Sequence, residues 1–90
     1  MLNILEKAVH ALKKAAQDLE PAVNAEDKTR IKNIARELEQ AMEQVDKVVM
    51  RINDRTSMSL GEIPKHIEEL AESGKFEELR KFLHDLKRKE

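Results

Sequence analysis

Apolar residues recur every three or four positions along most of this chain, which is the spacing of one face of an α-helix. The longest such stretch covers about residues 25–55 and contains neither glycine nor proline. We therefore predict one continuous helix over this range, roughly 45 Å long. Its apolar positions are Ile31, Ile34, Ala35, Leu38, Ala41, Met42, Val45, Val48, Val49 and Ile52.

The preceding segment predicts a first helix over about residues 2–19, whose apolar spacing ends at Leu19. Pro21 is expected to stop it, because a proline ring pushes the residue before it away from the helical region. Asn24 then suits the N-cap of the long helix, since its side chain can accept a hydrogen bond from an amide of the first turn. A connection this short predicts an antiparallel helical hairpin.

The last third of the chain predicts a second, shorter hairpin of helices. The apolar spacing resumes over about residues 62–73 and 75–88, and Gly74 lies between them. Glycine favours the left-handed conformation in which many helices end. Pro64 suits the first turn of the earlier helix, where an amide hydrogen has no partner within the helix.

Together these elements predict an all-α fold in which residues 1–90 form a single helical domain, a bundle of two hairpins with a long central helix. A compact chain of this length has a radius of gyration of about 12 Å, so the central helix is longer than one copy needs. We expect a second copy to cover its last turns, giving a homodimer or a higher helical oligomer. The interface candidates are Val45, Val48, Val49, Met50 and Ile52.

Composition bounds the environment in which such a protein works. Apolar residues make up 40% of the chain and charged residues 39%, and the net charge is −1, so no long-range field attracts nucleic acid or an anionic membrane. No apolar run reaches the about 18 residues that a membrane span needs, and the first residues lack the pattern of a signal peptide. We expect a cytoplasmic protein without a membrane partner. The basic residues Lys87, Arg88 and Lys89 suit the end of the last helix.

One stretch of the first helix resembles a known functional motif. Residues 10–16, His-Ala-Leu-Lys-Lys-Ala-Ala, are similar to the active helix of histidine phosphotransfer domains. In that family a lysine three residues after the phosphoacceptor histidine pairs with the phosphoryl group. The resemblance therefore implies a phosphoacceptor at His10 with Lys13 beside it. Lys14 departs from the family pattern, which usually has glycine there so that a receiver domain can approach closely.

The remaining sequence offers no further catalytic or metal-binding pattern. The chain has no cysteine, and none of its three histidines has a glutamate three positions before it, so the carboxylate–histidine motif of di-iron bundles is absent. We expect no metal, no cofactor and no enzymatic activity. The first hypothesis is a non-enzymatic helical protein–protein interaction module, a homo-oligomeric adaptor or regulatory subunit that binds itself and another protein. The alternatives are phosphotransfer at His10 and a nucleic-acid-associated accessory role.

Overall fold

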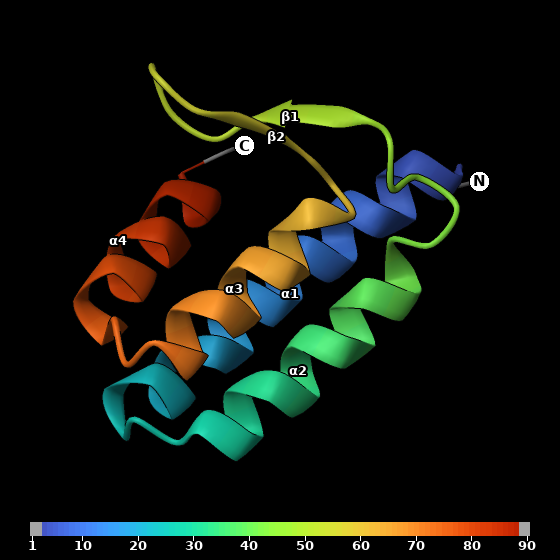
Figure 1. Ribbon diagram of the computed structural model, residues 1–90. Coiled ribbons are helices and arrows are strands. Elements are labelled where there is room, and N and C mark those ends of the chain that lie inside the picture. The colour runs from blue at the N-terminus through green and yellow to red at the C-terminus, as the bar shows by residue number, and fades with distance from the viewer. Residues whose placement is uncertain (1–2, 89–90) are drawn as a thin grey trace.

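The computed structural model describes residues 3–88, which form four helices and one small antiparallel sheet. Figure 1 shows that the β1–β2 ribbon lies over the end of the bundle at which α1 and α3 begin. The elements are α1 (Ile4–Asn24), α2 (Lys28–Ala41), β1 (Val49–Arg51), β2 (Ser57–Ser59), α3 (Glu62–Glu72) and α4 (Phe76–Lys87).

The chain is mostly helical and compact, with a radius of gyration of 12.1 Å. It is not all-α, because residues 49–51 and 57–59 pair as strands. The two C-terminal helices lie within one residue of the predicted ranges 62–73 and 75–88. Helix α1 begins at Ile4, and residue 2, its predicted start, lies outside the described residues.

The helices pack around one apolar core. Helix α1 lies against α2 and α4, and α3 lies against the same two helices. No polar or charged side chain of the described residues is buried, so apolar contact holds the core together, at about 1.5–3 kcal/mol for each large side chain removed from water. The largest fully buried side chains are those of Leu12, Leu19, Ile31, Met42, Ile52, Leu60, Ile63, Ile67, Leu79, Leu86, Val23 and Pro64.

The predicted continuous helix over residues 25–55 is wrong. Helix α2 ends at Ala41, turns follow over residues 42–47, and strand β1 comes next. The turns still satisfy backbone groups, since the amide of Val45 donates a hydrogen bond of 3.0 Å to the carbonyl of Met42. The chain therefore reverses its direction where the sequence pattern predicts that it continues.

Burial of apolar side chains explains this reversal. A straight helix of about 45 Å exceeds the longest extent of the molecule, 36 Å, and would carry its last apolar residues into solvent. After the reversal Val45 is only 8% exposed and Ile52 only 2% exposed, both within the chain's own core. Residues 3–88 thus contain no helix long enough to require cover from a second copy, so the predicted dimer loses this argument and stays a prediction.

Helix α1 also differs from its prediction, because it continues through Pro21 to Asn24. A proline in the last turn removes one backbone hydrogen bond, and the complete burial of Ala22 and Val23 offsets that loss. The N-cap of α2 is consequently Asp27 rather than Asn24, and its side chain accepts a hydrogen bond of 3.1 Å from the Arg30 amide.

Helices α1 and α3 end in the same backbone motif, with a left-handed residue after the cap. After α3 this residue is Gly74, with φ 71°, and the Lys75 amide donates back to Leu70 at 2.9 Å. After α1 it is Glu26, with φ 54°, and the Asp27 amide donates back to Ala22 at 3.0 Å. A side chain with a Cβ is disfavoured in this conformation, so Glu26 holds a strained backbone.

Gly61 closes the base of the ribbon, where its amide donates a hydrogen bond of 3.0 Å to the carbonyl of Asp46. A Cβ atom at Gly61 would lie 2.5 Å from the Cβ and 3.1 Å from the Cα of Asp46. The two backbones can approach this closely only because residue 61 has no side chain. This contact fixes the turns after α2 against the start of α3.

The left-handed residues that follow α1 and α3 predict opposite effects of substitution. Glu26→Gly should stabilise the protein by roughly 0.5–1 kcal/mol, because it relieves the strain of the left-handed backbone. The opposing effect is smaller, since glycine only raises the conformational entropy of the unfolded chain. Gly74→Ala should destabilise it by about 1 kcal/mol through the backbone alone, since no atom lies within 4 Å of the added Cβ. Urea unfolding measures both, and a destabilising Glu26→Gly would contradict the assigned backbone conformation.

Gly61→Ala should destabilise the protein by roughly 2–3 kcal/mol, because the methyl group would overlap the Cβ of Asp46 and press against its backbone. This is a larger loss than that of Gly74→Ala, which serves as the control for adding a methyl group to a glycine. The free energy of unfolding in urea is the measurement. A loss below about 0.5 kcal/mol would show that the two backbones do not meet at this point.

Candidate functional site

The ribbon formed by residues 48–60 has an inner face that packs on the helices and an outer face that does not. On the inner face Ile52 and Leu60 are buried, and the paired Met50 and Met58 pack against the core. Successive side chains of a strand point to opposite faces. The outer face therefore carries the residues between them, which are Val49, Arg51, Ser57 and Ser59.

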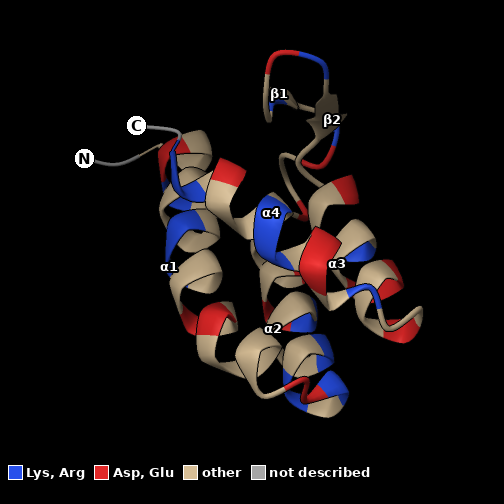
Figure 2. Cartoon of the chain, turned by 90° about the vertical axis from the view of Figure 1, so that its left-hand side faces the viewer, with Lys and Arg blue, Asp and Glu red and all other residues tan. Residues whose placement is uncertain are grey.

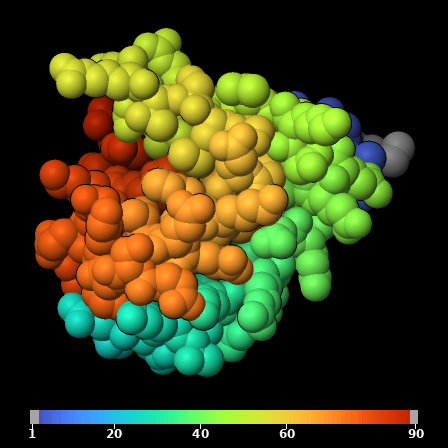
Figure 3. Space-filling model, in the orientation of Figure 1, coloured from blue at the N-terminus to red at the C-terminus, as the bar shows by residue number. Residues whose placement is uncertain are grey.

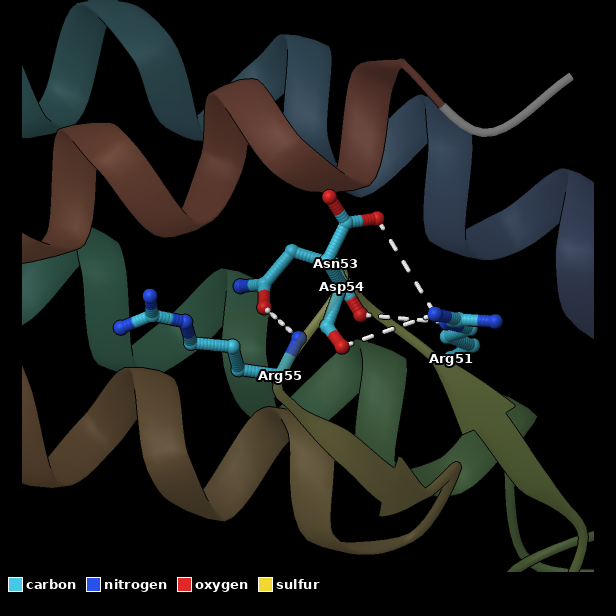
Figure 4. A network of polar contacts seen from close by, with 4 residues as sticks. All are labelled: Arg51, Asn53, Asp54 and Arg55. Carbon is cyan, nitrogen blue, oxygen red and sulfur yellow. Dashed lines mark hydrogen bonds and ion pairs between the residues drawn. The ribbon is translucent and has the colours of Figure 1, made fainter.

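The turn of the ribbon is held by a polar network centred on Asn53 (Figure 4). Its side-chain oxygen accepts a hydrogen bond of 2.9 Å from the Arg55 amide, and its backbone oxygen accepts one of 3.3 Å from Arg51 Nε. Its Nδ2 donates to Asp85 Oδ2 of α4 at 3.1 Å. The network ties the turn to the helices, although the tip of the ribbon projects beyond them in the space-filling view (Figure 3).

The two edges of the ribbon have different neighbours. Strand β2 lies beside α3, whereas no Cα atom of a described helix lies within 8 Å of a Cα atom of β1. Hydrogen bonds of 2.8 Å run from Ile52 N to Thr56 O and from Leu60 N to Val48 O. Paired groups alternate along an antiparallel strand, so the backbone amides and carbonyls of Val49 and Arg51 point away from β2. Strand β1 thus presents an open hydrogen-bonding edge.

Large apolar side chains remain exposed at this same end of the molecule. The N-terminal turn of α1 and the start of β1 both lie at the end marked N in Figure 1. Between α1 and the end of α2 lies a shallow depression of about 360 Å³, with Ile4, Ala41 and Gln44 in its lining. The exposed apolar residues and their exposed fractions are Ile4 53%, Leu5 42%, Val48 39% and Val49 67%.

The structure separates the five interface candidates into two groups. Val45 and Ile52 are buried in the core of the described chain, and Met50 is half-buried against that core. Val48 and Val49 are exposed. Sequence reasoning missed Ile4 and Leu5 as exposed neighbours of this end. Ile4 lies outside the apolar stripe of its helix, and this position indicated that its side chain would be exposed. Leu5 lies on the stripe, so its position gave no such indication.

The phosphotransfer residues lie on α1, away from the ribbon turn. His10 is exposed and Lys13, three residues later on the helix, is half-buried. Lys14 lines a small groove between α1 and α2, of about 210 Å³, together with Ala11 and Ala15. No contact within the described chain links His10 to a second functional group, so its role as a phosphoacceptor stays a prediction.

A second groove, of about 210 Å³, lies between α1 and α4, and Glu20, Arg80 and Lys87 of its lining each make polar contacts within the chain. Arg80 Nε donates to Asn24 Oδ1 at 3.1 Å, and the Arg80 guanidinium also meets Glu77. Lys87 forms an ion pair with Glu20. Arg80 and Lys87 thus each face an oxygen atom of the chain itself. Lys89, the last of the predicted basic run, lies outside the described residues.

Charges are mixed across the rest of the surface. Figure 2 shows Lys and Arg interspersed with Asp and Glu on the helices in view, without a face of one sign. Among residues 3–88 no three histidine or acidic side chains cluster in a way that could hold a metal ion. None of the helices in this range has the length and apolar character that crossing a membrane requires.

The open edge of β1, with the exposed Val48 and Val49 on it, is therefore the candidate binding surface of the described chain. Comparison with known proteins assigns no function to them. No protein-family model matches this chain, and no curated protein or solved structure matches it.

Proposed function

We propose that this protein is a non-enzymatic protein–protein interaction module, a homo-oligomeric adaptor or regulatory subunit that binds through the ribbon end of its bundle. The observation that carries the proposal is the coincidence of the open β1 edge with Val48 and Val49, the exposed apolar residues that flank it. An open edge offers backbone hydrogen bonds to an added strand, and side chains along it give specificity.

The energetics favour an interaction at this end. Val49 is 67% exposed, and burying such a side chain in an interface gains about 1–2 kcal/mol. An edge strand with unpaired amides also tends to pair with another strand, which most proteins prevent with charges, proline or a covering element. Here Arg51 is the one charged residue within β1, and the strand contains no proline.

The polar contacts elsewhere give no comparable reason for binding. The groove between α1 and α4 is occupied by its own ion pairs, and the mixed surface charge suits a protein partner better than nucleic acid. The ribbon turn is already tied to α4 through Asn53 and Asp85. A partner can therefore dock on a preformed surface and need not order a flexible loop.

Site-specific photo-crosslinking in cells that express the protein tests the proposal. A benzophenone amino acid in place of Val48 should give crosslinked adducts that are heavier than a homodimer. Mass spectrometry should identify the same foreign protein in all of these adducts. The yield should fall at least about fivefold when Val49→Asp is added, since this charge opposes burial of the apolar surface. The control position is Gln17, an exposed polar residue on α1.

The proposal fails on either of two results. In the first, position 48 yields no adduct heavier than a homodimer. In the second, positions 48 and 17 yield the same adducts in equal amounts, which would mean that the ribbon end attracts no specific protein.

A further inference from the structure

We propose that a second copy of this chain pairs with the open edge of β1, so that two β1 strands run antiparallel about a two-fold axis at Met50 and the two ribbons form one four-stranded sheet. This inference rests on the proposed function, because it names a partner for the same surface. It differs from a dimer built on a long helix, since it needs only the edge that the folded monomer leaves open.

The hydrogen-bonding pattern restricts how two β1 strands can pair. Only the backbone groups of Val49 and Arg51 point outward, because Val48 and Ile52 already bond to β2. In an antiparallel pair, outward residues must face outward residues. A two-fold axis can then lie at residue 49, 50 or 51, and these three registers are the candidates.

Charge selects among the three registers. An axis at residue 51 places Arg51 opposite the Arg51 of the second copy, and an axis at residue 49 places it opposite Lys47. Like charges that face each other across two strands are destabilising. An axis at Met50 instead places Arg51 opposite Val49, twice by symmetry, with four backbone hydrogen bonds between the copies.

The register centred on Met50 also suits the side chains of the outer face. The aliphatic part of Arg51 can lie along Val49 of the second copy while its guanidinium stays in water. Lys47 comes beside Asn53 and Asp54 of the second copy, and Asp54 carries the opposite charge. Within one copy Asp54 already pairs with Arg51 at 4.0 Å. This ion pair is largely exposed, so it is too weak to prevent Asp54 from pairing with Lys47 of the second copy.

A second copy matches this edge because the pairing is self-complementary. The same patch serves both partners, as a two-fold interface requires. The net charge of −1 is small, so two copies do not repel each other strongly. The pairing also brings Val49 of each copy beside Arg51 of the other chain, which covers part of a side chain that is 67% exposed in one copy.

Proline substitutions at matched positions test the pairing. Arg51→Pro removes an outward amide of β1, and Ser57→Pro removes the outward amide directly opposite on β2. In sedimentation experiments over about a hundredfold range of concentration, the wild type and Ser57→Pro should form dimers with similar dissociation constants. Arg51→Pro should raise the dissociation constant at least about tenfold. A monomeric wild type, or equal losses in both variants, would overturn the inference.

Disulfide trapping tests the register even if a proline variant fails to fold. The chain has no cysteine, so Val49→Cys and Arg51→Cys each introduce a single thiol. When differently tagged samples of the two variants are mixed and oxidised, the mixed dimer, which joins position 49 of one copy to position 51 of the other, should exceed either like-with-like dimer. Only the axis at Met50 places these two positions opposite each other. Predominant like-with-like dimers would overturn this register.

The outcomes separate this inference from the proposed function. A purified wild type that stays monomeric while position 48 still crosslinks to a foreign protein would overturn the dimer and leave the interaction module in place. A purified dimer with the mixed disulfide, but without foreign adducts in cells, would support the pairing and remove the role as an adaptor for another protein.

Discussion

The structure depends on the burial of a few apolar side chains that the chain reaches only by reversing its direction after α2. Val45 and Ile52 enter the core because the helix ends at Ala41, and the close backbone contact of Asp46 with Gly61 fixes the reversed segment in place. Each large buried side chain contributes about 1.5–3 kcal/mol, which exceeds what the lost helical hydrogen bonds would contribute on an exposed rod. Tertiary burial thus decides where α2 ends.

The same reversal creates the surface on which the proposed function rests. The ribbon covers one end of the core with its inner face. Strand β2 lies beside α3, whereas no Cα atom of a described helix lies within 8 Å of a Cα atom of β1. The outer edge of β1 is consequently left with unpaired backbone groups and with Val49 largely exposed. Fold and function are linked here because covering the core with two strands, rather than with a helix, leaves one strand edge open.

Sequence reasoning succeeded where local signals decide the structure and failed where distant contacts do. Helices α3 and α4 follow from apolar spacing, and the turn between them follows from Gly74, both of which act locally. The end of α2 has no such signal, because residues 42–47 contain neither glycine nor proline and include good helix formers. The β-branched residues of segment 48–52, followed by Asn-Asp, were a local sign of a strand and turn that the helical spacing obscured. Val48 and Val49 were therefore identified as exposed for the wrong reason.

Nuclear Overhauser contacts in the purified protein test the central claim, the reversal after Ala41, most directly. The account predicts strong contacts between the α-protons of Val49 and Ser59 and between those of Arg51 and Ser57, because these pairs face each other across the ribbon without hydrogen bonds between them. Contacts from each α-proton to the amide three residues later, continuing without interruption through residues 42–55, would show a long helix and contradict the account.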